Sequence, residues 1–143
     1  MPLSREAIVD QLKEIVGSER VITDETVLKK NSIDRFRKYA DIHGIYTLPI
    51  PAAVVKLGST EQVSRVLAFM NQHKINGVPR TGASATEGGL ETVVKDSVVL
   101  DGAGMNQILS IDIENMQATA QCGVPLEILE NALREKGRSE ERL

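Results

Sequence analysis

Aromatic side chains and cysteine are scarce in this sequence. Only 3% of the residues are aromatic, Trp is absent, and a single cysteine, Cys122, occurs among 143 residues. One cysteine excludes an intramolecular disulfide and is typical of proteins from a reducing compartment. Few aromatic rings leave few platforms on which nucleic-acid bases could stack. The core must therefore be built mainly from aliphatic side chains.

The sequence also has neither an excess of basic charge nor a long apolar run. The formal net charge is −3 at pH 7, which provides no basic footprint for nucleic acid or an anionic membrane. No apolar run approaches the roughly 20 residues that span a bilayer. The N-terminal stretch MPLSREAIVDQLKEIVG is amphipathic and contains acids, unlike a secretory signal or a transit peptide. We expect a cytoplasmic protein with no nucleic-acid partner and no membrane span.

Residues that often carry catalysis or bind metals are few and scattered. His43 and His73 are the two histidines, and no Cys or carboxylate cluster at ligand spacing accompanies them, so we predict no metal site. Cys122 alternates with apolar residues, which predicts a buried, inert thiol. Glu87 and Glu91 could act as a base or a ligand, but two acids on a loop are more simply interpreted as solvated. We therefore assign no catalytic residue.

Helix caps and helical periodicity predict several helices. Ser4 precedes apolar residues at helical spacing and Gly17 follows them, which is typical of a capped helix. Ser59 and Gln62 have the spacing of a capping box ahead of another amphipathic stretch. The predicted helices run from Ser4 to Gly17, from Thr23 or Asp24 to Lys30, from Ser59 to Lys74 and from Pro125 to Gly137.

Short apolar runs predict strands between these helices. AAVVKL, INGVPR and DSVVLD are typical strands, and QILSIDIENMQATAQCG indicates a hairpin that turns near Glu114 and Asn115. A helix-length crossover predicts that the strands at Ala52–Leu57 and Ile75–Pro79 are parallel neighbours. The hairpin adds antiparallel pairing, so we expect an α+β fold with a small mixed sheet and flanking helices. SIDRFRKYADIHGIYTLPIP is predicted to be mainly an extended connection.

A loop of small residues, VPRTGASATEGGLE, follows the second predicted strand. Its glycines allow positive φ and let another group approach the backbone closely. Successive N–H groups in such a turn form a concave nest for anions. Thr81, Ser84 and Thr86 add hydroxyl groups, and Arg80 could add positive charge at the mouth. The pattern suits a pyrophosphate, but a surface loop that needs glycine only for turning has the same composition.

Known phosphate-binding motifs do not account for this loop. No G-x-x-x-x-G-K-[ST] occurs in the sequence, which excludes a P-loop. GAGMNQ, at residues 102–107, begins like a dinucleotide fingerprint but lacks its third glycine. The hairpin that follows leaves room for barely a turn of helix, so Rossmann-type binding is disfavoured.

The order of these pieces resembles a known flavoprotein family. The sequence begins this order with the strand AAVVKL, then STEQV with its helix, and then a strand that ends in Pro-Arg. A glycine-rich loop that closes on Gly-Gly follows, and after it come SVVLD, MNQIL and a hairpin that ends at Gly123. This order is similar to the first part of the flavin domain in the vanillyl-alcohol oxidase and p-cresol methylhydroxylase superfamily. The branch that it resembles contains D-lactate dehydrogenase, the flavin subunit of glycolate oxidase and alkyldihydroxyacetonephosphate synthase. SIDRF fits the N-terminal lead-in of that family more weakly.

The resemblance implies a cofactor, FAD, and a set of residues that bind it. Backbone N–H groups from about Thr81 to Ala85 would face the FAD pyrophosphate, and the Gly-Gly pair would let the chain pass close to it. The candidate cofactor-binding residues are Arg80, Thr81, Gly82, Ala83, Ser84, Ala85, Gly88 and Gly89.

The loop departs from the pattern of the family at three positions. Family loops usually have glycine where this chain has Thr81 and Ala83, and Gly82 lies between them, so the flexible position is expected to have moved. Alanine at positive φ costs on the order of 1 kcal/mol relative to glycine. An altered turn or weaker binding would follow. Members with covalent FAD carry the attaching histidine where Ser84 stands, so FAD would be bound non-covalently.

The resemblance also implies the limits of this chain. We expect an N-terminal helical lead-in at residues 1–50, part of an FAD-binding domain (its first subdomain) at residues 51–137 and a polar tail at residues 138–143. The chain would stop about where the second flavin subdomain begins, and none of the family's catalytic groups has a counterpart. We expect the FAD-binding portion of an FAD-linked oxidoreductase, either 2-hydroxy-acid dehydrogenase/oxidase-like or alkyldihydroxyacetonephosphate-synthase-like.

Two classes of function remain open at this point. The chain would be inactive alone, and a second chain or self-association would complete the flavin site. The alternative is a non-catalytic stump or interaction module that keeps the fold without binding flavin.

Overall fold

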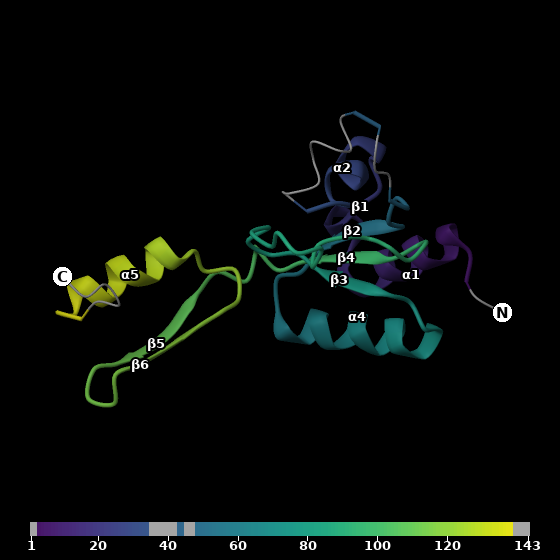
Figure 1. The fold of residues 1–143 in the computed structure, drawn as a ribbon. Helices are drawn as coiled ribbons and strands as arrows, with labels where there is room; N and C mark the ends of the chain where they lie inside the picture. Colours follow the sequence, from purple (N-terminus) through teal and green to yellow (C-terminus); the bar gives the residue numbers. More distant parts are fainter. Residues whose placement is uncertain (1–2, 35–42, 45–47, 139–143) are drawn as a thin grey trace.

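The computed structural model describes residues 3–34, 43–44 and 48–138. Within them, four strands form a central sheet in the order β1-β2-β4-β3, with helices on both faces (Figure 1). The strands are β1 (Val21–Ile22), β2 (Ala53–Lys56), β3 (Gly77–Pro79) and β4 (Val98–Asp101). β1 is antiparallel to β2, whereas β2 and β3 are both parallel to β4. The predicted α+β class with a small mixed sheet is confirmed.

The order of the parallel strands differs from the expectation. β2 and β3 are not neighbours, because β4 lies between them and pairs with both. A crossover of helix length favours a parallel direction for the two strands that it joins, but it does not determine whether another strand lies between them in the sheet. Val98 and Val99 are fully buried, as a central strand requires, whereas Pro79 lacks an amide hydrogen and suits an edge strand. The strands predicted at Ala52–Leu57 and Ile75–Pro79 are parallel and lie in one sheet, as expected, but the prediction that they are neighbours was wrong.

The helices lie close to their predicted bounds. They are α1 (Arg5–Val16), α2 (Glu25–Lys30), α4 (Thr60–His73) and α5 (Leu126–Glu135), with a 3₁₀ turn, η1 (Ser18–Arg20), after α1. The side-chain oxygens of Ser4, Asp24 and Ser59 each accept a first-turn N–H, as N-caps do. The caps that local sequence predicted therefore form. The extended connection predicted after residue 31 falls largely on residues outside the described ranges.

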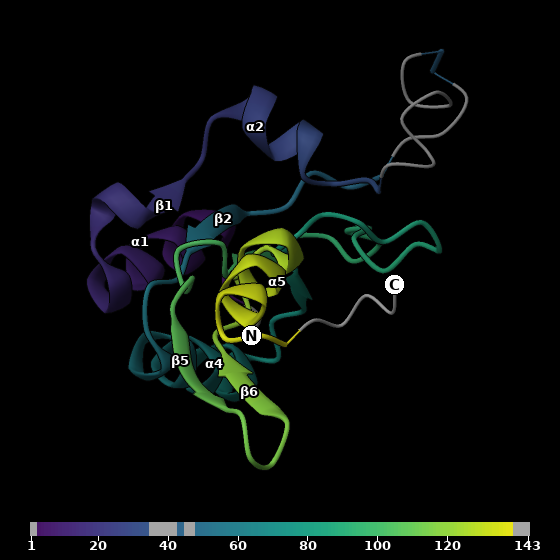
Figure 2. The ribbon, with the colours of Figure 1, turned by 90° about the vertical axis from the view of Figure 1, so that its left-hand side faces the viewer.

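The two faces of the sheet are covered by different helices. α1 and α4 bury Leu12 and Val66 against Val55 of β2, on one face. α2 buries Leu28 against Val99 of β4, on the other face. Figure 2 shows α2 and α4 on opposite sides of the sheet. The sheet is therefore the middle layer of a three-layer body.

The predicted hairpin forms a separate sheet. β5 (Ile108–Asp112) and β6 (Gln117–Ala120) pair antiparallel and, with α5, project from the three-layer body (Figure 1). The hairpin turns at residues 113–116, as expected. It does not join the central sheet, so the mixed character of that sheet comes from β1, which the sequence did not reveal. Large apolar side chains are exposed on the hairpin and on α5, among them Leu109, Ile113, Met116, Leu126 and Ile128.

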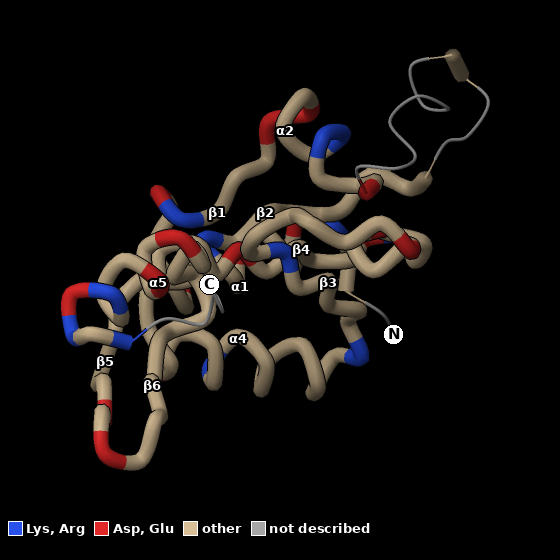
Figure 3. The backbone as a smooth tube through the Cα atoms, turned by 60° about the vertical axis from the view of Figure 1, so that its left-hand side comes forward, with Lys and Arg blue, Asp and Glu red and all other residues tan. Residues whose placement is uncertain are grey.

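Acidic and basic residues are interspersed over the described chain (Figure 3). α2 carries Glu25 in its first turn and Lys29 and Lys30 in its last, which complements the helix dipole. Among the described residues, no helix combines the length and the apolar character needed to cross a membrane.

Candidate functional site

The carboxyl ends of the three parallel strands meet at one edge of the sheet. Lys56 is level with Asp101 in the pairing of β2 with β4, and Pro79 is level with Leu100 in the pairing of β3 with β4. The N–H of Arg80 donates to the carbonyl of Leu100 at 2.9 Å and continues this ladder by one residue. The candidate loop, residues 81–89, therefore begins at the carboxyl edge, where open parallel sheets bind their ligands.

The backbone of the loop turns at two positions with positive φ. Ala83 has a φ of 51° and Gly88 a φ of 86°. Gly82 does not share this conformation, so the expectation that the flexible position had moved to Gly82 was wrong. The left-handed turn lies at Ala83, where loops of the flavoprotein family that this sequence resembles usually have glycine. Among the described residues, the backbone N–H groups of residues 81–87 donate no hydrogen bond, so they are available to a ligand.

The candidate residues differ in their exposure. Gly82, Ala83, Ser84 and Gly89 are exposed, and Arg80, Thr81, Ala85 and Gly88 are half-buried. An added Cβ at Gly82 or Gly89 would meet nothing closer than 3.6 Å. The exposed part of the loop thus presents small side chains and backbone, which suits close approach by a phosphate group.

A buried acid that sequence reasoning did not assign lies against the end of the loop. Asp34 is fully buried, and its Oδ2 accepts the N–H of Gly88 at 2.7 Å. Thr92 is also fully buried and donates its backbone N–H to the carbonyl of Ser32 at 2.9 Å. Its hydroxyl donates to the carbonyl of Pro49 at 2.6 Å. The only available sequence signal was the weak fit of SIDRF to the family lead-in, which did not indicate these contacts.

Arg80 is directed toward the same buried segment. Its Nη1 donates to the carbonyl of Ile33 at 3.1 Å. Burial lowers the pKa of Arg80 from its ordinary value, and the carboxylates of Asp101 and Asp34 oppose that shift. The guanidinium is therefore held beneath the loop, and the predicted role for its charge at the mouth stays a prediction.

A second, tightly packed turn borders the loop after β4. Asp101 accepts the N–H of Ala103 at 2.9 Å, so it shapes the turn. A Cβ added at Gly102 would lie 2.9 Å from both Thr81 Oγ1 and Cys122 Sγ. A Cβ at Gly123 would lie 2.5 Å from the carbonyl oxygen of Gly102. These glycines allow the start of the loop and the end of the hairpin to pack closely.

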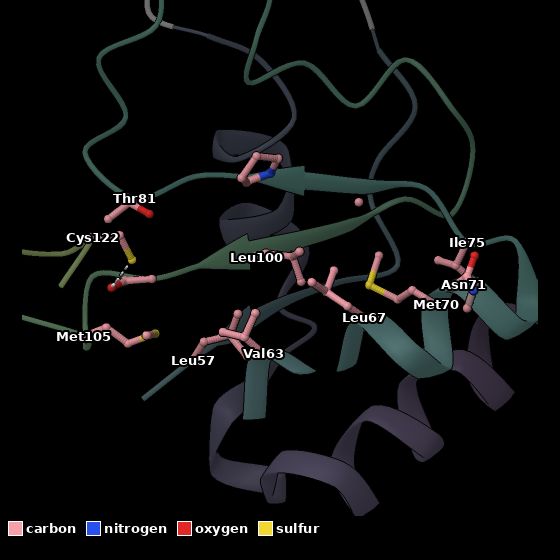
Figure 4. A pocket seen from close by; sticks show the side chains of 13 residues that line it. Leu57, Val63, Leu67, Met70, Asn71, Ile75, Thr81, Leu100, Met105 and Cys122 are labelled. Atoms are coloured by element: carbon pink, nitrogen blue, oxygen red, sulfur yellow. Dashed lines mark hydrogen bonds between the residues drawn. The ribbon is translucent and has the colours of Figure 1, made fainter. Parts of the chain in front are cut away.

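An apolar groove of about 630 Å³ runs along α4 and the β3 side of the sheet. Figure 4 shows Thr81 and Cys122 at one end of it and Asn71 and Ile75 at the other. Leu57, Val63, Leu67, Met70 and Leu100 line the stretch between. The groove therefore reaches the first residue of the candidate loop.

Two expectations about single residues were wrong. Cys122 is exposed because it lies beyond the end of β6, on a hairpin that no second layer covers among the described residues. Its Sγ makes a weak contact with the carbonyl of Gly102 at 3.8 Å. Glu91 is buried, whereas Glu87 is exposed as expected, because the chain turns inward after Gly89 to reach Thr92. His73 lies in the last turn of α4, as predicted.

Comparisons with known proteins agree with this arrangement. The model of the family described as "FAD binding domain" matches residues 51–141, more than half of the chain. An uncharacterised FAD-linked oxidoreductase, YgcU, of Escherichia coli strain K12 is 89% identical over 137 residues, which are 96% of this chain and 28% of that protein. D-2-hydroxyglutarate dehydrogenase of Stutzerimonas stutzeri is 32% identical over 92% of this chain and 26% of the relative. The chain thus spans about a quarter of the length of these relatives.

Solved structures show the same fold. Alkyldihydroxyacetonephosphate synthase matches with a TM-score of 0.82 at 24% identity, over 95% of this chain and 26% of that one. p-Cresol methylhydroxylase matches with a TM-score of 0.74 at 24% identity, over 92% and 25% of the two chains. The chain therefore belongs to the FAD-binding domain family of FAD-linked oxidoreductases, with FAD as the cofactor.

Proposed function

We propose that residues 81–89 hold the pyrophosphate of FAD, mainly through backbone N–H groups. The observation that carries this proposal is the loop itself, which starts at the carboxyl edge of parallel strands and leaves the N–H groups of residues 81–87 without partners among the described residues. Neutral donors distributed over two phosphates suit an anion in a half-exposed site. Gly89, with room around its Cα, lets the cofactor approach the backbone.

The cofactor is held without a covalent bond in this proposal. Ser84 stands where covalent members of the family that this sequence resembles carry the attaching histidine. A serine hydroxyl can donate a hydrogen bond to a phosphate oxygen but does not form the histidine–flavin link. Denaturation of a loaded protein should therefore release FAD.

The whole protein is proposed to oxidise a 2-hydroxy acid or a related substrate. The support is similarity to D-2-hydroxyglutarate dehydrogenase of Stutzerimonas stutzeri and to glycolate oxidase subunit GlcD of Bacillus subtilis. An alkyldihydroxyacetonephosphate-synthase-like reaction is the other candidate, supported by the fold alone. Bound FAD would accept the hydride. This chain supplies one wall of that site, and we expect no turnover from it alone.

The hairpin and α5 are proposed to contact the part that completes the flavin site, either a second chain or a second copy. Met116 is 79% exposed and Leu126 67% exposed, which is unusual for large apolar side chains that gather on neighbouring elements. Within the part of the chain that the structure describes, neither face of the hairpin carries a covering layer comparable to α1 and α4. We place the assembly in the cytoplasm, as the single cysteine favours. Light scattering of the purified chain tests self-association, and a strict monomer leaves a separate chain as the partner.

FAD binding by glycine variants tests the site. Gly88→Val and Gly89→Val should weaken FAD binding more than Glu87→Ala, because bulk obstructs approach whereas Glu87 is exposed and solvated. Gly89→Val is the cleaner variant, because a Cβ at Gly89 has ordinary contacts in the free chain. Unchanged FAD affinity in Gly89→Val would contradict the pyrophosphate site. A colourless chain that ignores added FAD would favour the non-catalytic module.

Activity assays test the proposal that this chain does not turn over substrate alone. The isolated chain is assayed with excess FAD, an artificial electron acceptor, and D-lactate, glycolate or D-2-hydroxyglutarate. We expect no turnover above that of free FAD, because this chain offers no group assigned to substrate binding or proton abstraction. Sustained turnover that co-purifies with the chain would show that the catalytic groups lie within it.

A further inference from the structure

A buried carboxylate beneath the nucleotide loop is an unusual feature for a phosphate site. Asp34 is 0% exposed, and its Oδ2 accepts the N–H of Gly88 at 2.7 Å. Removing a carboxylate from water is costly unless hydrogen bonds or opposite charge compensate. A negative charge close to bound phosphates would also repel them. The cost of burying this carboxylate has to be offset, and the contacts of Asp34 indicate what the residue does in the structure.

The segment of Asp34 holds the loop at both ends. The carbonyl of Ile33 accepts Nη1 of Arg80, the residue directly before the loop, at 3.1 Å. Asp34 itself holds Gly88, near the end of the loop. Shortly before Asp34 in the sequence, the carbonyl of Ser32 accepts the N–H of Thr92, which follows the loop, at 2.9 Å. Residues 81–87 lie between these anchors and donate no backbone hydrogen bonds within the described chain. The anchors therefore restrain the loop and leave its donors for a ligand.

Charge compensation accompanies this restraint. Arg80 is half-buried and bonded to this segment through the carbonyl of Ile33, and the carboxylates of Asp101 and Asp34 raise its pKa against the effect of burial. The positive charge of Arg80, which is bonded to the carbonyl of Ile33 directly before Asp34, opposes the field that this carboxylate exerts on bound phosphates.

We propose that Asp34 is a positioning residue for FAD: it fixes the loop through the N–H of Gly88, while Arg80 neutralises it. This inference rests on the proposed pyrophosphate site. Loop order and FAD affinity are separate observables, so the two proposals can fail separately.

The first test measures amide exchange by NMR in the 143-residue chain without FAD. The Gly88 amide should be protected, and Asp34→Ala should speed its exchange by about tenfold or more, because a hydrogen bond to a charged acceptor is lost. Ser97→Ala is the matched control. Ser97 is fully buried and hydrogen-bonds Asn76 and Val94, but it lies at the opposite end of β4. Amides of β2 report general destabilisation.

The outcomes of this test are distinct. Faster exchange at Gly88 than at the β2 amides in Asp34→Ala, without such a difference in Ser97→Ala, supports the restraint. An unprotected Gly88 amide in the unmodified chain would overturn it. Equal acceleration of all amides in Asp34→Ala would also overturn it. If Asp34→Ala does not fold, Asp34→Asn is measured in its place, because the asparagine side chain keeps an acceptor oxygen. The Gly88 amide of Asp34→Asn should then be better protected from exchange than the same amide in a misfolded loop.

The second test measures FAD affinity by quenching of flavin fluorescence. Arg80→Met should weaken binding by about tenfold, because it removes the positive charge that lies beside the segment of the Asp34 carboxylate. The double variant Asp34→Asn/Arg80→Met should bind more tightly than Arg80→Met alone, because the repelling charge is gone. Purely additive losses would overturn the neutralising role of Arg80. If Asp34→Ala alters loop exchange but leaves FAD affinity unchanged, Asp34 does not position FAD. If Gly89→Val binds FAD normally while the exchange results hold, the pyrophosphate site fails and the restraint stands.

Discussion

Gly88 and Gly89 are adjacent, yet the structure predicts opposite responses to the same substitution. Gly88 has a φ of 86°, and a Cβ there would lie 3.3 Å from Oε2 of the buried Glu91. Gly89 is not in the positive-φ region, and its Cβ would lie 3.6 Å from that of Ala85, an ordinary contact. The two glycines are indistinguishable in the sequence, so different responses would report their different backbone conformations and surroundings.

The expected magnitudes follow from backbone sterics. A residue with a Cβ in the left-handed region costs about 1–2 kcal/mol. Alanine in place of glycine also restricts the unfolded chain, which returns about 0.4–1 kcal/mol to the folded state. Gly88→Ala should therefore lower the free energy of unfolding by about 1 kcal/mol, and the tight contact with Glu91 adds to this loss. Gly89→Ala should leave it unchanged or raise it by up to about 1 kcal/mol.

Urea unfolding followed by circular dichroism measures both variants against the unmodified chain. Thermal unfolding is the second readout, with a shift of about 2–4 °C expected for each kcal/mol in a chain near this length. Equal destabilisation of Gly88→Ala and Gly89→Ala would refute the assigned backbone conformation. A stabilised Gly88→Ala would refute it more strongly, because no alanine gains from positive φ.

Further predictions concern the loop, the packed turn and the hairpin. Ala83→Gly should raise the free energy of unfolding by up to about 1 kcal/mol, because Ala83 is in the left-handed region, and a loss in urea unfolding would contradict this. Gly123→Ala should destabilise the fold by more than about 2 kcal/mol, since its Cβ would lie 2.5 Å from the carbonyl oxygen of Gly102, and unchanged thermal unfolding would contradict that contact. Hydrogen bonds from Asn115 lower the pKa of Asp112 from its ordinary value of 3.8. The resulting stabilisation is complete above that value and is lost as the pH falls through the lowered pKa. Asn115→Ala should raise the pKa of Asp112 in an NMR titration of its carboxyl group, and an unchanged titration would contradict the assignment.

Local features of the fold could be predicted because their signals lie within a few residues of each other. Ser4, Asp24 and Ser59 cap the helices that follow them, and the side chain of Gln62 accepts the N–H of Gly58 instead of closing the box on Ser59. The hairpin turn and the bounds of α5 were likewise visible in the sequence. Short-range hydrogen bonds and periodicity determine all of these elements.

Features that depend on distant residues could not be predicted in this way. Asp34 and Gly88 are 54 positions apart, and no local pattern links an acid after Ile33 to the end of a glycine-rich loop. The place of β4 between β2 and β3 depends on burial of both faces of this strand, Val98 on one and Val99 on the other, which a short apolar run does not reveal. The exposure of Cys122 could not be predicted, because period-two alternation indicates a face of a strand but not what covers it, and no described element forms a second layer over the hairpin.

The backbone of residues 81–89 is proposed to bind the pyrophosphate of FAD. An NMR titration of the ¹⁵N-labelled chain tests this binding most directly. Millimolar FAD should shift the amides of residues 81–89, while riboflavin, which lacks the phosphates, should leave them in place. The amides of α1, on the face of the sheet away from α2, should respond to neither ligand. Shifts that riboflavin reproduces, or FAD-induced shifts that bypass residues 81–89, would contradict the account.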